Sequence, residues 1–400
     1  MTEFLPYVVS WNLTRKCNLR CKHCYIDASA AGPRELSTDE VCRGLVEIAD
    51  VHRETILILT GGEPLLHADL DLIVSRAAAL GMMVVLGTNG TTLTSERAAR
   101  LADRGLSGVG ISVDSSAAPR HDEFRGVPGA WSAAWRGVEA ARRAGLEVQI
   151  QMTLTPATLG ELSEVARMAR EAGARVLTVF FLVCTGRGQS LVDLTPEQYE
   201  SALRSLARAP LDGIMVRPRC APTFRRVLAQ DSPDSELLHS DAGRCMAGKN
   251  YCRITPEGDV TPCPYMPVTA ESLRERSFGE IWRSSPILAA LRQPALKGRC
   301  SICEYREICG GCRARAFASG GDMLGEDPGC AYVPGTDRRA APFIPAPLSW
   351  TPEAEERIKN VPFFVRSAVR SAIESLARRR RLACVTPELL DEARRTMKRP

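Results

Sequence analysis

Three cysteines near the start of the chain have a spacing that suits iron–sulfur chemistry. Cys17, Cys21 and Cys24 form CNLRCKHC, with the pattern CxxxCxxC. Three thiolates on one short loop can hold three irons of a [4Fe–4S] cluster, which otherwise usually has four cysteine ligands. The fourth iron is then open to another molecule. A zinc knuckle that includes His23 is the alternative, but zinc sites favour paired spacings and His23 lies inside the loop.

A second group of eight cysteines lies within residues 245–330. Cys245 is followed by Gly258 and, after four further residues, by Cys263. Four more cysteines have the spacing CxxCxxxxxCxxC, and one follows after seventeen residues: Cys300, Cys303, Cys309, Cys312 and Cys330. The eighth is Cys252. So many cysteines in so short a segment indicate metal binding, either as iron–sulfur clusters or as structural zinc ions.

The composition fits a soluble protein of two or three domains, with 400 residues, 44% hydrophobic and 25% charged. The sequence contains no apolar run of membrane-spanning length and no signal-peptide layout, so a cytoplasmic location is expected. Fifteen cysteines in such a protein favour metal binding over disulfides. The net charge of the whole chain is +5, and residues 349–400, with 12 Lys/Arg and 7 Asp/Glu, carry the same net charge. The first 348 residues are therefore neutral in sum, so nucleic acid is not an expected partner.

The apolar pattern predicts the elements that position the cysteine loop. Short apolar runs, each followed by an amphipathic segment, predict strands at 7–13, 55–60, 83–88, 108–114, 147–154 and 175–182. Strands that alternate with helices predict right-handed βα units and a parallel sheet. Six units predict an α/β fold, a partial (β/α)6 TIM-like barrel over residues 1–210. Its chemistry is expected at the carboxyl ends of the strands.

Glycine and polar residues follow these predicted strands and should therefore lie on one rim. They are Gly61, Gly62 and Glu63 after the second strand, Asn89 after the third, Ser112 and Asp114 at the end of the fourth, and Thr153 at the end of the fifth. Four separate motifs on the same rim predict a binding site there more strongly than any one of them alone.

The rest of the chain divides by composition. Residues 211–244 are expected to be an irregular bridge, and residues 245–333 a Cys-rich auxiliary-cluster domain. Residues 334–349 are rich in Pro and Ala and are expected to form a linker. Residues 350–400 are expected to form a small helical domain of three short helices.

The CxxxCxxC loop, its position near the N-terminus and the aromatic Tyr25 after the third cysteine resemble the radical S-adenosylmethionine (SAM) superfamily. In that family the open iron binds the amino and carboxylate groups of SAM, and one electron cleaves SAM to a 5′-deoxyadenosyl radical. By this resemblance Gly61, Gly62 and Glu63 meet the methionine amino group. The resemblance also implies that Asn89, Ser112 and Asp114 contact the ribose hydroxyls or the methionine carboxylate of SAM. By the same resemblance Arg125 pairs with that carboxylate, and Tyr25 lines the adenine site.

The downstream cysteines resemble the SPASM extension of radical SAM enzymes, which carries two auxiliary [4Fe–4S] clusters. The family pattern assigns auxiliary cluster I to Cys245, Cys252, Cys263 and Cys312. It assigns auxiliary cluster II to Cys300, Cys303, Cys309 and Cys330. The spacing before Cys312 is two residues, where the family usually has three. The expected cofactors are therefore three [4Fe–4S] clusters and SAM.

Several stretches resemble the haem-biosynthesis branch of this family, among them FFLVCTGRGQSLVDLTPEQYE and CRITPEGDVTPCPYMPV. The tail, with WTPEAEERIKNVPFF, resembles the small C-terminal domain of protochlorophyllide reductase. These resemblances imply oxidative decarboxylation of coprohaem propionates to vinyl groups. In that reaction the radical takes a propionate β-hydrogen, carbon dioxide leaves, and an auxiliary cluster can accept the remaining electron. A small redox protein is the expected electron donor.

Two cysteines and one arginine are candidates for roles toward the substrate. Cys184 after the sixth strand and Cys220 in the bridge can each donate a hydrogen atom or a proton, although buried cysteines are usually inert. Arg187 in the GRG loop is a candidate propionate partner. The same domain set also serves peptide maturases and proteins that modify a tungsten-pterin cofactor, and a non-enzymatic iron–sulfur scaffold is a third class.

Overall fold

The computed structural model describes most of the chain. The described residues are 4–28, 32, 34–208, 213–233, 235–239, 243–336, 348–361, 369–370, 373–374, 376–377, 380 and 382–397. Within these ranges, no helix has the length and apolar character needed to cross a bilayer.

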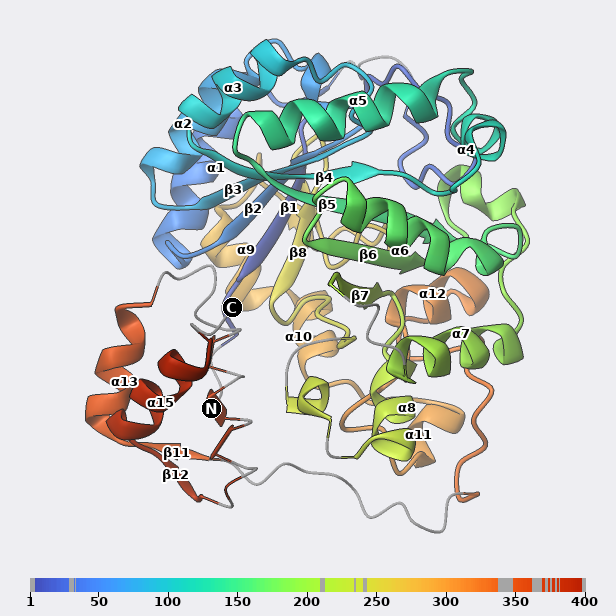
Figure 1. Ribbon diagram of the computed structural model, residues 1–400, viewed down its shortest axis with the longest axis vertical. Coiled ribbons are helices and arrows are strands. Elements are labelled where there is room, and N and C mark those ends of the chain that lie inside the picture. Colours follow the sequence, from blue (N-terminus) through green and yellow to red (C-terminus); the bar gives the residue numbers. More distant parts are fainter. Residues whose placement is uncertain are drawn as a thin grey trace.

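Six βα units form the N-terminal half, in agreement with the expected partial barrel (Figure 1). The strands pair in parallel and in chain order. Their bounds are β1 (Val8–Asn12), β2 (Ile56–Thr60), β3 (Met83–Thr88), β4 (Leu106–Ser112), β5 (Glu147–Leu154) and β6 (Val176–Phe181). The helices are α1 (Thr38–Val51), α2 (Leu70–Ala79), α3 (Ser95–Asp103), α4 (Ala118–Arg125), α5 (Ala130–Arg143) and α6 (Leu162–Glu171). α1 begins with a capping box formed by Ser37 and Glu40.

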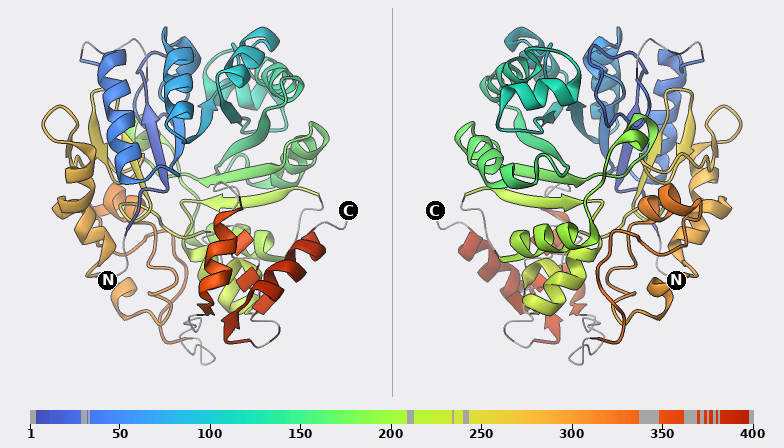
Figure 2. Two further views of the ribbon diagram at one scale, coloured as in Figure 1. Left: turned by 90° about the vertical axis from the view of Figure 1, so that its left-hand side faces the viewer. Right: turned by 90° about the vertical axis from the view of Figure 1, so that its right-hand side faces the viewer.

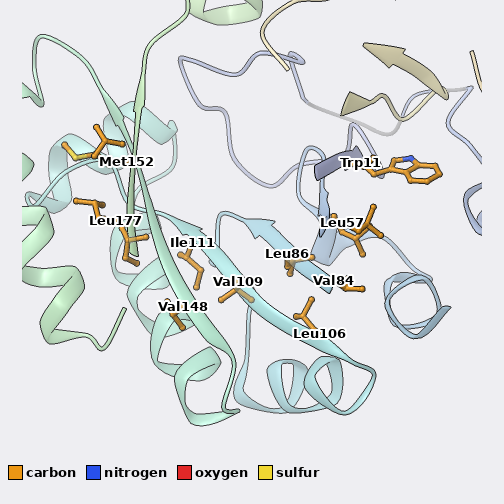
Figure 3. Close-up of a cluster of buried hydrophobic side chains, with 14 of the residues drawn as sticks. Trp11, Leu57, Val84, Leu86, Leu106, Val109, Ile111, Val148, Met152 and Leu177 are labelled. Atoms are coloured by element: carbon orange, nitrogen blue, oxygen red, sulfur yellow. The ribbon is translucent and has the colours of Figure 1, made fainter. Parts of the chain in front are cut away.

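Alternation along the strands gives the sheet two different faces. In β3, Val84 and Leu86 are buried in the main core, and the residues between them face the other way. Figure 3 shows them clustered with Leu57, Val109 and Ile111 from neighbouring strands. Helix residues complete this core, so we call this side the helix-covered face and the opposite side the inner face.

The sheet extends beyond six strands in both directions. After α7 (Pro196–Arg208), β7 (Met215–Arg219) pairs in parallel with β6. β8 (Tyr251–Ile254) pairs in parallel with β1, and β9 (Asp259–Thr261) and β10 (Glu271–Ser272) continue the sheet antiparallel. The segment 211–244, expected to be irregular, therefore contributes β7, α8 (Thr223–Asp231) and a 3₁₀ turn at Glu236–His239.

The auxiliary region, residues 243–336, has little regular structure beyond β8–β10. Its helices are short: α9 (Phe278–Ser284), α10 (Pro286–Arg292), α11 (Arg299–Ile302) and α12 (Arg313–Gly320). Figure 2 shows this region, in yellow and orange, as long loops between short helices. The two sequence-expected boundaries at 210 and 333 remain predictions.

The C-terminal segment has its own small core. β11 (Ser349–Trp350) and β12 (Cys384–Val385) pair in parallel, and α13 (Pro352–Lys359) and α15 (Pro387–Met397) pack beside them. This core is built from small and aliphatic residues such as Ala354, Ile358 and Leu389. The expected middle helix at 363–381 falls partly outside the described residues, and so does the expected linker at 334–349.

Candidate active site and cluster-binding residues

The cysteine loop leaves the carboxyl end of β1 and is bonded to the turn after β2. Gly62 N donates to Thr14 O at 2.7 Å, and Glu63 N donates to Lys16 O at 2.8 Å. A Cβ on Gly62 would lie 2.3 Å from Lys16 O, so only glycine permits this approach. The GGEP segment therefore fixes the start of the loop through its backbone.

Two other rim segments hold the rest of the loop. From the end of α4, Arg125 O accepts from Arg20 N at 3.0 Å. From the turn after β6, Arg187 N donates to Cys24 O at 3.0 Å, next to Gly186, whose φ is +56°. A Cβ at Gly186 would lie 2.4 Å from Cys24 O. The loop is thus clamped by segments that follow β2, β4 and β6.

Each thiol of the loop receives a hydrogen bond. Leu19 N donates to Cys17 Sγ at 3.4 Å, and Ala28 N donates to Cys24 Sγ at 3.3 Å. Arg125 Nη1 donates to Cys21 Sγ at 3.6 Å. Such bonds stabilise thiolates and tune the potential of a cluster that the thiolates hold.

The thiols of the loop are close enough to act on one another. Burial raises the pKa of Cys17 to about 11, with smaller contributions from the charges of Glu63, Cys21 and Cys24. A raised pKa means that forming the thiolate costs free energy. Iron ligation offsets this cost, because the ligand is the thiolate and the metal is cationic. His23 stacks on Phe124 with ring centroids 4.4 Å apart, and burial lowers its pKa to about 3, so its imidazole is neutral.

Glu63 is fully buried and joins the second and third rim segments. Its carboxylate accepts from Leu65 N at 3.1 Å, from Thr88 Oγ1 at 2.6 Å and from Asn89 N at 2.8 Å. Burial raises its pKa, and these three donors oppose the rise. Asn89 in turn donates from Nδ2 to Asn18 Oδ1, inside the cysteine loop, at 2.9 Å. Both residues therefore position the loop as well as the rim.

Asp114 and Arg125, both expected to contact SAM, form a buried ion pair. Arg125 Nε donates to Asp114 Oδ2 at 2.6 Å, and Thr153 N donates to Asp114 Oδ1 at 2.9 Å. Burial opposes ionisation of Asp114, but the Arg125 charge prevails and lowers its pKa to about 2. Because Arg125 also reaches Cys21, the pair supports the cysteine loop. Direct contact of either residue with SAM remains a prediction, as does that of the half-buried Ser112 at the end of β4.

Tyr25 lies between the cysteine loop and the auxiliary region. Its hydroxyl accepts from Asn12 Nδ2 at 2.9 Å, and its ring meets the Tyr265 ring edge to face at 5.4 Å. The Arg253 guanidinium lies 5.8 Å from the Tyr25 ring centre. Tyr265 follows Cys263 by two residues, so this aromatic pair connects the first cysteine loop with one of the auxiliary cysteines.

The two residues expected to act on the substrate differ in their surroundings. Arg187 donates from Nε to Cys21 O at 3.0 Å and from Nη1 to Asp27 Oδ1 and Ala28 O. These bonds tie Arg187 to the cysteine loop. Cys184 contacts Leu191 O at 3.7 Å, and burial raises its pKa. A propionate contact for Arg187 and hydrogen or proton donation by Cys184 both remain predictions.

Four auxiliary cysteines line one pocket that is partly open to solvent, namely Cys300, Cys303, Cys309 and Cys330. Arg226, Asp327 and Tyr332 share the lining. A Cβ on Gly311 would lie 3.3 Å from Cys300 Sγ and 2.8 Å from Asp327 Cβ. A larger residue at this position would therefore crowd the pocket beside Cys300. The set assigned to auxiliary cluster II thus comes together around a space, and its thiols suit a [4Fe–4S] cluster.

Three of the cysteines assigned to auxiliary cluster I also come together. Cys245 and Cys263 pack on the small core that contains Cys312. Cys252 instead lies fully buried in the main core, under the helices. Among the described residues, no three Cys, His, Asp or Glu side chains are arranged to hold a single metal ion. In a [4Fe–4S] cluster each thiolate binds its own iron.

Comparison with known proteins identifies the family. Residues 11–169 match the radical SAM superfamily, residues 245–313 match the SPASM iron–sulfur cluster-binding domain, and residues 350–394 match the proto-chlorophyllide reductase 57 kD subunit. The AdoMet-dependent heme synthase of Methanosarcina barkeri is 38% identical over 341 residues, or 82% of this chain and 97% of that protein. The chain belongs to the radical SAM superfamily. Its SPASM domain and relatives place it with the haem-biosynthesis branch.

Two further similarities fit this radical SAM protein. The pre-heme d1 synthase of Dinoroseobacter shibae is 34% identical over 353 residues, covering 81% of this chain and 85% of that protein. Streptococcus suis SuiB bound to precursor peptide SuiA has the same fold, with a TM-score of 0.66 at 16% identity, covering 82% of this chain and 76% of SuiB. A SAM-dependent iron–sulfur enzyme with [4Fe–4S] clusters follows from the family.

The three cysteines of the first loop fit the SAM-binding cluster, since each has a hydrogen-bond donor and the loop is held from three sides. Sequence patterns gave no indication of three arginines on strands β7 and β8, namely Arg217, Arg219 and Arg253, or of the buried pair of Arg315 and Asp327. Alternation along the strands could have indicated the first group only if β7 and β8 had been recognised as strands.

Proposed function

We propose that this radical SAM enzyme oxidatively decarboxylates the propionate side chains of coprohaem, leaving vinyl groups. The similarity to a protein named AdoMet-dependent heme synthase, which extends over 97% of that protein, supports this substrate class. The structural observation that carries the proposal is a pair of arginines on β7 at the inner face of the barrel.

Strand register places these arginines on the inner face. Val216 packs against the main core on the helix-covered face. Side chains alternate along a strand, so Arg217 and Arg219 point to the inner face. Their partners on β6, Thr178 and Phe180, alternate in the same way with core residues. Arg219 ends β7, at the rim where the cysteine loop leaves β1.

The electrostatics of this pair favour an anionic substrate. Burial lowers the pKa of Arg217, and the charge of Arg219 lowers it further. A carboxylate beside them would relieve both effects and can form two parallel hydrogen bonds with a guanidinium. Arg253 on β8 adds a third cation to the inner face, and it is 5% exposed. Coprohaem carries several propionates, which match several arginines on one surface.

SAM held at the open iron supplies, when cleaved, a 5′-deoxyadenosyl radical that takes a hydrogen atom from the substrate. The residues of this chain have two tasks around that event. The clamped loop holds Cys17, Cys21 and Cys24 at the rim. Arg217 and Arg219 would orient a propionate, which fixes the carbon that faces the radical.

An anaerobic assay tests the proposal. The reconstituted protein is mixed with SAM and a reductant, with and without coprohaem, and 5′-deoxyadenosine and tetrapyrrole masses are measured. We expect coprohaem to stimulate deoxyadenosine formation, with loss of carbon dioxide and two hydrogens from each reacting propionate. Deoxyadenosine formation that ignores coprohaem, with an unchanged tetrapyrrole mass, would falsify the proposal.

Variants of the arginine pair test the binding mode. In Arg217→Gln and Arg219→Gln we expect the KM for coprohaem to rise by about tenfold to a hundredfold, since each loses a charge-assisted hydrogen bond. SAM cleavage without substrate should stay unchanged. The control is Arg175→Gln, an exposed arginine at the other end of β6 whose partner is Glu147. An equal KM for all three variants and the parent protein would place the propionates elsewhere.

A peptide is the second candidate substrate. The fold is shared with SuiB, whose solved structure contains a precursor peptide. A peptide that stimulated deoxyadenosine formation in the same assay, where coprohaem does not, would favour this candidate.

A further inference from the structure

The family pattern assigns Cys252 as the fourth ligand of auxiliary cluster I, but Cys252 lies in the main core, away from the other three cysteines of that set. We propose that Cys220, rather than Cys252, completes the set with Cys245, Cys263 and Cys312. The proposal rests on the [4Fe–4S] cofactors of the family and is independent of the substrate.

Cys220 lies in the same small core as the other three thiols. This core is formed by Val183, Ala247, Met266, Leu291, Cys312 and Ala314. Cys220, Cys245 and Cys263 pack directly against it. The chain comes back to this point from three regions: the end of β7, the loop around β8 and β9, and the start of α12. Figure 1 shows β7 ending beside α12.

The four thiols lie within reach of one another. Cys220 interacts with Cys312, Cys263 and Cys245, and Cys263 interacts with Cys312 and Cys245. Four thiols gathered at one small core suit a cluster that takes one thiolate at each iron.

Cys252 lies on the wrong side of the sheet for this set. In β8 it pairs with Val9, while Arg253 pairs with Ser10 and Ile254 with Trp11. Cys252 and Ile254 belong to the main core on the helix-covered face, and the two residues beside Cys252 face inward. A one-residue slip that turned Cys252 inward would bury Arg253 in that apolar core, which is costly. The charged group that acts on Cys252 is Arg292.

The backbone at Cys220 is held in a conformation that few residues adopt. Its φ is +58°, in the left-handed region, which is strained for a residue other than glycine. Arg315 Nη2 donates to Cys220 O at 2.8 Å and thereby fixes this conformation. Strained backbone of this kind persists where the surrounding structure over-determines it, often at ligand sites.

The same arginine connects Cys220 to Cys312. Arg315 Nη1 donates to Asp327 Oδ1 at 3.0 Å, and Asp327 Oδ2 accepts from Cys312 N at 2.7 Å. Arg315 and Asp327 are 5% and 1% exposed. A buried chain of hydrogen bonds therefore runs from the carbonyl of Cys220 to the amide of Cys312, which holds the backbone of the two residues together. Such supporting bonds orient the ligands of a metal site.

The test compares two single variants, Cys220→Ser and Cys252→Ser, after anaerobic reconstitution without SAM or tetrapyrrole. Iron and sulfide per chain are measured together with the Mössbauer and EPR spectra. We expect Cys220→Ser to lose up to one cluster of iron or to show a three-iron signal. Cys252→Ser should keep the iron content and spectra of the parent protein.

Two outcomes would overturn the inference. One is loss of a cluster in Cys252→Ser, and the other is a full, unaltered set of clusters in Cys220→Ser. If Cys220→Ser fails to fold, Cys252→Ser alone still tests the assignment, because parent-like iron content and spectra in that variant exclude Cys252 as a ligand. Neither variant involves coprohaem, so failure here is distinct from failure of the proposed function.

Discussion

The loop at Cys17–Cys24 and the auxiliary segment at 299–336 both hold cluster cysteines, but they are built differently. The first loop is bonded through its backbone to segments that follow β2, β4 and β6. The auxiliary segment has two short helices, and its cysteines line a pocket. A radical site needs the first cluster at one fixed place on the rim, and the barrel provides that place before iron binds. In the auxiliary segment, we expect metal ligation to supply much of the folding free energy.

The largest expected effect is that of removing iron. In the iron-free protein we expect amide hydrogen exchange in 299–336 to accelerate by on the order of a hundredfold or more, because the ligated state no longer holds the segment. Exchange in β3 and β4 should change little, and the loop at 16–24 should keep most of its protection. Hydrogen-exchange mass spectrometry measures all three. Equal loss of protection in both cysteine regions would abolish the contrast between them.

Substitution of Gly62 tests the clamp on the first loop. In Gly62→Ala the new Cβ would lie 2.3 Å from Lys16 O, a backbone atom that cannot move without displacing the loop. We expect SAM cleavage to fall by roughly tenfold to a hundredfold, as for a disturbed metal site, with auxiliary iron retained.

A matched control separates this effect from that of adding a methyl group elsewhere. A Cβ at Gly160 would meet nothing within 4 Å. Gly160→Ala should therefore keep parent-like SAM cleavage. Equal activity of the two variants would show that the GGEP approach does not fix the loop.

Arg187 gives the smallest expected effect. Arg187→Lys removes the hydrogen bond from Nε to Cys21 O and the two bonds from Nη1 to Asp27 Oδ1 and Ala28 O. We expect the affinity of the cysteine loop for its iron–sulfur cluster to fall by about tenfold. Iron retained under a graded chelator measures this.

The control for Arg187 lies in the same loop. Lys22 pairs with Glu123 at the surface, and exposed pairs contribute little. Lys22→Gln should match the parent protein in the chelator titration, and a loss as large as that of Arg187→Lys would contradict the role given to Arg187.

The sequence predicted the six βα units because their apolar runs alternate clearly with amphipathic helices. It did not predict β7, because Arg217, Pro218 and Arg219 make that strand polar, and its pairing with β6 is a tertiary feature. The parallel pairing of β8 with β1 was also beyond the sequence, since more than two hundred residues separate them.

The site shows the same limits. Spacing indicated the three cysteines of the first loop. The family pattern assigned the set around Cys300 and Cys330, which the structure brings together around one pocket. The same pattern assigned Cys252 to auxiliary cluster I, but a position in the chain does not say on which face of a strand a side chain lies. Cys220 has no motif around it, and its proximity to Cys312 depends on the buried Arg315 and Asp327. The rim residues Glu63 and Asp114 were found by position, but their bonds to the cysteine loop required the structure.

The central claim is that the clamped loop generates a radical that acts on a propionate. The most direct measurement uses coprohaem deuterated at the propionate β-carbons, with anaerobic protein, SAM and a reductant, and follows the mass of 5′-deoxyadenosine. The account predicts transfer of one deuterium into 5′-deoxyadenosine, together with formation of a vinyl group. Unlabelled 5′-deoxyadenosine accompanied by unchanged coprohaem would contradict it.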